Sequence, residues 1–258
     1  MVNAHQIHYK GVQVMKKIVV MMAAVLMTAV ASVAMAEVKV SGDVYVSPAS
    51  KYVWRGFDLS DGRGVVQGGV DVSYKDFTVS YWSNEQMVSG PNLKAGEVTE
   101  TDITLNYTFK PVELLTLNVG NIYYNLDSIP DTNELYLKAT LNTLLSPTFA
   151  VYCDWQQAKD TGLFYTFSVG HSLEVMKNLA LNLGALASYN MKSDYSVGEY
   201  NNWHNYELTA SADYSINDNI KISPYYLYSN AFNSTARNKA VLEVTDQSIV
   251  GLKAAFIF

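Results

Sequence analysis

The chain has 258 residues, with 18 basic and 24 acidic side chains and a formal net charge of −6 at pH 7. This acidic balance disfavours nucleic acid as a partner, and the single cysteine excludes an intramolecular disulfide framework. With 49% hydrophobic residues and only 6 prolines, nothing in the composition indicates a disordered chain.

The first 36 residues predict a secretory signal peptide preceded by a short extension. Lys16 and Lys17 follow Met15, residues 18–33 are apolar, and residues 34–36 form a small-x-small cleavage site. We therefore expect 1–14 to lie upstream of the true start, 15–36 to form the signal peptide, and 37–258 to form the mature protein after cleavage following Ala36. The apolar run is shorter than the roughly 20 residues of a spanning helix, so an uncleaved anchor is the less favoured alternative.

The part after Ala36 carries 15 basic against 24 acidic residues, because residues 1–36 hold three lysines and no acid. It has no apolar run as long as a spanning helix, so any insertion into a membrane must use strands. Apolar and polar residues alternate with a period of two through most of this part, which predicts β-strands. Twelve strands are expected, at residues 38–47, 65–74, 77–82, 102–109, 115–124, 134–141, 149–156, 165–170, 181–190, 206–214, 220–228 and 244–258.

The connections between these strands predict the topology. Two-residue and four-residue links such as 75–76 and 216–219 force antiparallel hairpins, whereas the links at 48–64, 85–100, 191–203 and 230–242 are long and polar. The fold class predicted is therefore all-β, a transmembrane antiparallel up-and-down barrel of about 12 strands with short periplasmic turns and long extracellular loops. A secreted lipocalin-like barrel is the alternative, but it has eight strands and an apolar interior.

Aromatic residues on the apolar parity favour the membrane barrel. They lie towards strand ends, where two interfacial girdles are expected, and include Tyr74, Phe77, Tyr107, Trp155, Tyr206 and Tyr226. The last strand alternates up to its aromatic final residue, Phe258. We expect this strand to close the barrel in contact with outer-membrane lipid and to be the part recognised by the barrel-assembly machinery.

If the apolar parity faces lipid, the polar parity lines the lumen. Seven acidic against four basic side chains tilt such a pore towards cations, because rings of charge are how pores select ions. The alternative is that these charges pair across strands and only fill the lumen. The acidic residues are Asp43, Asp71, Asp102, Glu134, Asp154, Glu207 and Asp213, and the basic ones are Lys39, Lys138, Lys221 and Lys253.

An outer-membrane lipid hydrolase is the enzymatic alternative, and it needs a serine–histidine pair on the outer wall. Only His171 and His204 follow Ala36. His204 is expected at the loop rim on the outward parity, whereas Ser188 and Ser229 are on the inward parity, so no pair forms. We predict no catalytic residue, no cofactor, and no metal site, since the sequence has no ligand cluster and no phosphate-binding glycine loop.

One stretch resembles a known family. Residues 50–57 read Ser-Lys-Tyr-Val-Trp-Arg-Gly-Phe, residues 60–62 Ser-Asp-Gly, and residues 66–71 Val-Gln-Gly-Gly-Val-Asp. This pattern resembles the opening of the TorF family of porin-like outer-membrane proteins, although that family has aspartate where Lys51 stands. The resemblance covers about 25 residues and implies a porin-like barrel of unknown substrate, with no catalytic residues.

The same stretch gives a structural expectation. If the first strand keeps its parity past Pro48, then Tyr52 and Trp54 reach the outer interface. Arg55 would then point inward and face Asp71 or Asp43, which would fix the register of the first hairpin or narrow the mouth.

Taken together, the sequence predicts an outer-membrane channel for passive diffusion of small polar or cationic solutes. The alternative from another class is a plugged structural or surface-interaction barrel whose long loops bind a ligand. An outer-membrane lipid hydrolase is less favoured than either.

Overall fold

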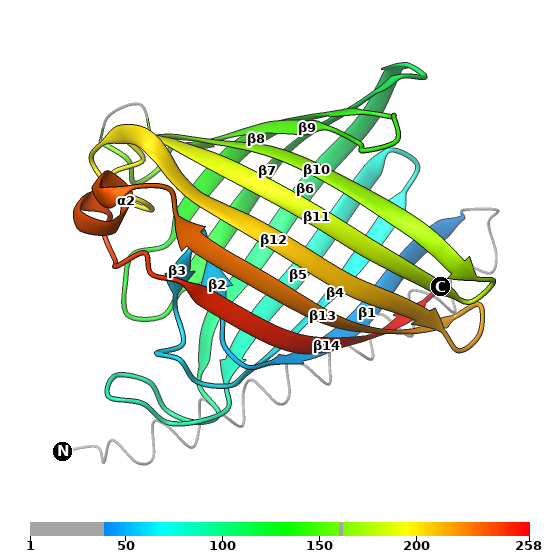
Figure 1. Ribbon diagram of the computed structural model, residues 1–258, viewed down its shortest axis with the longest axis horizontal. Coiled ribbons are helices and arrows are strands. Elements are labelled where there is room, and N and C mark those ends of the chain that lie inside the picture. Colours follow the sequence, from blue (N-terminus) through cyan, green and yellow to red (C-terminus); the bar gives the residue numbers. More distant parts are fainter. Residues whose placement is uncertain (1–38, 160–161) are drawn as a thin grey trace. The chain divides into compact units, whose positions relative to one another are not determined.

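The computed structural model describes residues 39–159 and 162–258. The predicted signal peptide, its cleavage site after Ala36 and residues 1–14 all lie outside the described residues. From Val40 to Phe258 the chain forms one unit, a closed barrel of antiparallel strands (Figure 1).

The wall contains twelve strands, each hydrogen-bonded to its neighbours along the chain, with the first and last strands paired to close it. This confirms the predicted fold class within the described part of the chain. The strands are β1 (Val40–Ala49), β4 (Val65–Tyr74), β5 (Phe77–Gln86), β6 (Val98–Val112), β7 (Leu115–Leu126), β8 (Thr132–Leu141), β9 (Thr148–Asp154), β10 (Leu163–Met176), β11 (Leu179–Met191), β12 (Asn201–Ser215), β13 (Ile220–Ala231) and β14 (Gln247–Ile257).

The outer face of the wall is apolar, as the alternation predicts. Large side chains such as Leu105, Leu137, Leu183 and Val250 are about half exposed or more in the isolated chain. A soluble protein buries such residues, so a continuous belt of them on a closed barrel matches the hydrocarbon of a membrane. No helix among the residues that the structure describes has the length and hydropathy to cross a bilayer.

Strand β1 continues through Pro48 to Ala49, two residues beyond the predicted end. Proline has no amide hydrogen, and Ser47 and Pro48 have no partners in β14, although the pairing with β4 is unbroken at both positions. The register with β14 is the same on either side of this gap, with Val46 opposite Ala254 and Ala49 opposite Gly251. Pro48 therefore interrupts the pairing with β14 locally without changing the register of the two strands.

The two ends of the barrel differ. Connections at the end that holds both termini of the wall are short, for example Lys75–Asp76 between β4 and β5. The other end carries the long connections, including residues 232–246 with the short helix α2 (Ser234–Lys239), which packs near β12 and β13. Asn233 caps α2 by accepting a hydrogen bond from the amide of Ala236 at 3.1 Å.

Residues 50–64, between β1 and β4, do not extend the wall. They fold inside the barrel and form a separate two-stranded hairpin of β2 (Val53–Trp54) and β3 (Phe57–Asp58) near its long-loop end (Figure 1). Phe57 is buried in a cluster whose other members come from β10, β13, α2 and the long connections: Phe164, Val197, Tyr200, Ala231, Ala236 and Val244. We call residues 50–64 the lumen hairpin.

The lumen hairpin corrects one prediction. Tyr52 and Trp54 were expected at the outer interface, but Tyr52 is buried and both residues line a cavity inside the barrel. The parity of β1 does not carry past Ala49, because the chain turns away from the wall at Ser50 and Lys51. The alternation of apolar and polar residues along a strand does not show where the chain changes direction.

Candidate functional site: the lumen and its hairpin

The tip of the lumen hairpin is a two-residue turn. Arg55 and Gly56 have φ of 51° and 82°, so both central residues are in the left-handed region of a type I′ turn. Trp54 pairs with Phe57 directly across the turn. Glycine suits the second position, and Arg55 is held at the first by the contacts of its side chain.

The side chain of Arg55 joins the hairpin to the opposite wall. Its guanidinium donates to both oxygens of Glu134 on β8, at 2.9 and 2.6 Å, and to the hydroxyl of Ser196 in the β11–β12 connection at 3.0 Å. The hydroxyl of Tyr124 donates to the same carboxylate at 3.0 Å. The predicted partners of Arg55, Asp71 and Asp43, are wrong because the hairpin carries Arg55 across the lumen to β8.

Aromatic rings surround the guanidinium. Its central carbon lies 4.3 Å from the ring centre of Trp54 and 4.2 Å from that of Phe164, distances at which a cation is attracted to the ring face. Burial opposes the charge on Arg55, but the charge and hydrogen bonds of Glu134, together with Tyr124 and Tyr152, raise the pKa of Arg55 above its ordinary value. The hairpin tip is therefore a permanently charged anchor.

His204 on β12 holds the backbone of the same tip. Its Nε2 lies 2.7 Å from the carbonyl oxygen of Arg55, and its Nδ1 contacts the hydroxyl of Tyr200. Since a carbonyl only accepts, Nε2 carries the hydrogen and Nδ1 accepts from Tyr200. The imidazole is thus used on both sides to position the hairpin.

The prediction that His204 faces outward at the rim is wrong. Between β11 and β12 the register shifts, so that Ala187 is opposite Tyr206 but Tyr189 is opposite Trp203. The one extra residue in β12 forms a bulge, which places Trp203 outside and His204 fully inside. As expected, Ser188 and Ser229 face inward, but both are hydrogen-bonded with Asn205.

Among the described residues, three cavities border the lumen hairpin and a fourth adjoins one of them. The mouth cavity, about 410 Å³, lies among the long connections and is lined largely by apolar residues such as Ile129 and Leu242. The tip cavity, about 250 Å³, lies beside Arg55 and includes Glu207. Trp54 lines both of these cavities and the next one, so its ring stands where they meet.

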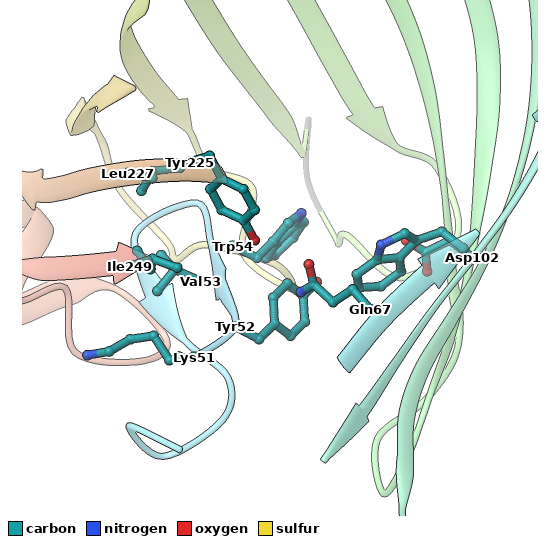
Figure 2. Close-up of a pocket in the computed structure, with 10 residues that line it drawn as sticks. Lys51, Tyr52, Val53, Trp54, Gln67, Asp102, Tyr225, Leu227 and Ile249 are labelled. Carbon is teal, nitrogen blue, oxygen red and sulfur yellow. The ribbon is translucent and has the colours of Figure 1, made fainter. Parts of the chain in front are cut away.

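The other two cavities adjoin each other along the opposite wall. The middle cavity, about 300 Å³, lies between the hairpin and strands β4, β5, β6, β13 and β14. Figure 2 shows Tyr52, Trp54, Gln67 and Tyr225 gathered around it, with Lys51 directed away. The lower cavity, about 620 Å³, shares Gln67, Trp82 and Tyr225 with the middle one and continues to the short-turn end.

Two ion pairs line the lower cavity. Lys253 lies 3.7 Å from Asp43, and Lys221 lies 3.7 Å from Asp213. The ammonium of Lys253 also stands 3.8 Å from the ring centre of Tyr45. Four of the predicted lumen charges thus meet as cross-strand pairs in the open part of the barrel.

The remaining predicted residues are spread along the lumen. Asp102 lines the middle cavity, Asp71 is opposite Asp43 in the wall, and Lys138 shares the inward parity of Glu134 on β8. Lys39 precedes β1 and is exposed. Asp154 is buried at the end of β9, where it accepts from Thr132 at 2.8 Å and from backbone amides of the following connection.

Aromatic residues that were not predicted as lining also border the lumen cavities. Trp82 and Tyr225 lie on the polar parity of their strands, and the alternation already placed them inward, but only charged side chains were considered as lining. Tyr52 and Trp54 could not be placed from the sequence, because they sit on the hairpin.

No protein-family model and no curated protein sequence matches this chain. Solved barrels do resemble it. The NanC porin aligns with a TM-score of 0.54 and 12% identity, covering 83% of this chain and 98% of the porin. The KdgM porin in complex with disordered oligogalacturonate gives 0.52 and 14%, covering 84% and 99%.

The COG4313 outer membrane channel from Pseudomonas putida F1 gives a TM-score of 0.51 and 10% identity, covering 86% of this chain and 96% of the channel. At these identities the likeness is one of fold. The chain shares the closed antiparallel barrel of these proteins over nearly their whole length.

Proposed function

We propose that the protein is a porin-like channel of the outer membrane, through which small polar or cationic solutes diffuse passively. The observation that carries this proposal is the pair of adjoining cavities beside the lumen hairpin, which together extend from Trp54 to the short-turn end. Charged side chains that line such a space are how pores select solutes, and four of them line the lower cavity.

Three further points support the proposal. The apolar outer belt fits a bilayer, the structural neighbours named above are porins and a channel, and residues 50–71 resemble the TorF family. The charged residues predicted to line the pore keep that role as part of the proposal. Asp43, Asp213, Lys221 and Lys253 border the lower cavity, where a passing solute would meet them.

We further propose that the mature protein reaches the outer membrane after cleavage following Ala36, through recognition of its last strand by the barrel-assembly machinery. Phe258 exchanges two backbone hydrogen bonds with Gly42, at 2.9 and 3.0 Å, so the final residue takes part in closing the barrel. Deletion of Phe258 should lower the amount of folded barrel in outer-membrane fractions. An unchanged amount would contradict this role.

Single-channel recording in planar bilayers tests the channel. The refolded protein should give discrete conductance steps. To show that current flows through the lumen, Ser211→Cys in a Cys153→Ser background should be blocked by a thiol reagent, because Ser211 lines the lower cavity. The neighbouring Ala212→Cys, on the outward parity, is the matched control and should be insensitive.

The second candidate is a plugged barrel that binds a ligand at its loops. The anchored hairpin and the apolar mouth cavity favour it. Silence of a correctly folded barrel in the bilayer would support this function and contradict the channel. A lipid hydrolase has less support, since His204 is engaged by Tyr200 and Arg55 rather than by a serine.

A further inference from the structure

The mouth cavity differs from the other cavities in its mainly apolar lining. Its volume of about 410 Å³ is in the range of cavities that hold small-molecule ligands. The apolar side chains come from parts of the chain that are far apart in the sequence. Trp54, Phe57 and Leu59 belong to the lumen hairpin, Leu126 and Ile129 to β7 and the connection after it, and Leu242 to the β13–β14 connection.

Some of these apolar residues lie on connections at the long-loop end and not on the wall. Ile129, Val241 and Leu242 are about half exposed in the isolated chain. The lipid belt explains exposed apolar side chains on the strands. It does not explain these three, because the long connections of a membrane barrel extend beyond the bilayer into water. Apolar residues that meet water and border a cavity indicate a binding site.

The carboxyl groups of the lining have partners inside the protein. Glu134 is paired with Arg55 at 2.6 Å. Glu100 accepts a hydrogen bond from the hydroxyl of Tyr52 at 3.0 Å and is hydrogen-bonded to the carboxyl of Asp102. Neither carboxyl group is therefore left without a partner that a charged ligand would have to supply.

The hydroxyl groups of the lining are engaged in the same way. The hydroxyl of Ser196 accepts from Arg55 at 3.0 Å. The other three donate hydrogen bonds within the protein: Tyr124 to Glu134, Thr132 to Asp154, and Tyr195 to the backbone carbonyl of Pro130. A charged or strongly polar ligand would give up its hydrogen bonds to water without gaining equivalent ones, and this costs free energy. An uncharged apolar ligand has no such loss.

The aromatic side chains favour a flat ligand. The rings of Trp54 and Tyr124 meet edge to face, with their centres 6.0 Å apart. A ring that stacks on one of them therefore meets the edge of the other, and both arrangements are favourable between aromatic groups.

We infer that the mouth cavity is a binding site for small uncharged aromatic molecules, which enter it from the long-loop end. The ligand would lie between the lumen hairpin and the connections, with its rings on Trp54 and Tyr124 and its edges against Ile129 and Leu242. The inference goes beyond the proposed channel function, because binding requires only this cavity and not conduction.

A fluorine NMR relaxation titration with 4-fluorotoluene, on the refolded barrel in lipid nanodiscs, tests the site. Empty nanodiscs of the same lipid are the reference, because the probe also dissolves in lipid. Wild type should bind more probe than the lipid alone takes up. The charged analogues 4-fluorobenzoate and 4-fluorobenzylammonium should bind about tenfold more weakly, since the lining offers their charges no free partner.

Substitutions in the lining test where the probe binds. Ile129→Asn and Leu242→Asn should each weaken binding of 4-fluorotoluene about fivefold, because each removes apolar surface from the cavity. Both positions are exposed, so the barrel should still fold. Val88→Asn is the matched control. Val88 is an exposed apolar residue of the β5–β6 connection that does not line the mouth cavity, and this variant should bind as wild type does.

Three results would overturn the inference: uptake of 4-fluorotoluene no greater than in empty nanodiscs, binding unchanged in both Ile129→Asn and Leu242→Asn, or tighter binding of either charged analogue. Bilayer recording separates the site from the channel function. A conducting barrel that does not bind 4-fluorotoluene keeps the channel and loses this site. A silent barrel that binds it through Ile129 and Leu242 keeps the site and loses the channel.

Discussion

Arg55 and Glu134 form a two-pronged ion pair with Nη1–Oε1 and Nη2–Oε2 distances of 2.9 and 2.6 Å, although 79 residues separate them in the chain. Both side chains are almost fully buried, at 8% and 1% exposure. The pair ties a hairpin that begins at one side of the barrel to a strand of the other side. It thereby decides where the open space of the lumen lies.

Removing one partner of this pair should be costly. Arg55→Ala leaves the Glu134 carboxylate buried without its cation, and we expect the free energy of unfolding in lipid to fall by about 3–5 kcal/mol. The double variant Arg55→Leu/Glu134→Leu should lose much less, because no charge is left alone. Urea titrations would measure both. Single-channel conductance should also change in Arg55→Ala, and a variant that is as stable and conducts as wild type would show that the pair anchors nothing.

The glycine at the hairpin tip offers a test that leaves the charges intact. Gly56 has φ of +82°, and a Cβ added there would lie 3.0 Å from Val244 and 3.2 Å from Asn205. Gly56→Ala should therefore strain the tip by about 1–3 kcal/mol and increase the noise of the open channel. Gly64→Ala is the matched control, since its Cβ would meet only ordinary contacts, the nearest at 3.6 Å. Equal behaviour of the two variants would exclude a strained tip.

Charge in the lower cavity should affect ion selectivity more than stability. Lys253 and Asp43 are 40% and 26% exposed, so their ion pair contributes no more than about 1 kcal/mol. Lys253→Gln leaves Asp43 unpaired beside the lower cavity. The reversal potential in a KCl gradient should therefore shift in the direction of greater cation selectivity. Lys75→Gln, in the short turn between β4 and β5, should leave it unchanged. A shift towards anions in Lys253→Gln would contradict a route past this pair.

Acid should loosen the connection between β7 and β8. Hydrogen bonds from Tyr123, Leu126 and Asn125 lower the pKa of Asp131 below its usual 3.8. A lowered pKa means that the stabilisation is fully present above the usual value of 3.8. It is lost as the pH falls through the lowered pKa of the folded protein. Hydrogen exchange of the Leu126 amide should thus be slower in wild type than in Asp131→Asn at pH 6. The difference between the two proteins should shrink as the pH falls below 3.8, and a difference that does not change with pH would refute the role of the carboxylate.

The orientation of the wall can be tested with spin labels. Labels on Leu137→Cys and Leu208→Cys in a Cys153→Ser background should collide with oxygen dissolved in lipid, because both side chains are on the apolar outer face. A label on Thr209→Cys, next to Leu208 but on the inward parity, should instead collide with a water-soluble nickel complex. Water exposure at Leu137 and Leu208 would contradict a membrane-spanning barrel.

The wall of the barrel could be predicted because the patterns that specify it lie within single strands and turns. Alternation with a period of two fixes which side chains face outward, and the two residues Lys75 and Asp76 are enough to specify a hairpin. The eighth strand was predicted too short: β10 continues past Gly170 to Met176, because polar His171 and Ser172 interrupt the hydrophobic pattern without ending the strand.

The interior was less predictable because its contacts are distant in the chain. Nothing near Arg55 indicates Glu134 as its partner, and only Gly56 hints at a tight turn where both central residues have positive φ. The bulge that turns His204 inward involves Ser188 on a neighbouring strand, so it cannot be detected from β12 alone. By contrast, the parity of Trp82 did place it in the lumen, which is the part of the site that the sequence could have supplied.

The position of the lumen hairpin in the chain has a consequence for the time course of assembly. The hairpin is synthesised directly after β1, but its anchors, Glu134, Ser196 and His204, follow 79, 141 and 149 residues later. Contacts that distant in the chain form slowly, and once β14 pairs with β1 the interior can be reached only through the two ends of the barrel. We therefore expect the hairpin to enter the lumen before β14 pairs with β1, and variants that weaken its anchors to accumulate as intermediates in which these two strands are not yet paired.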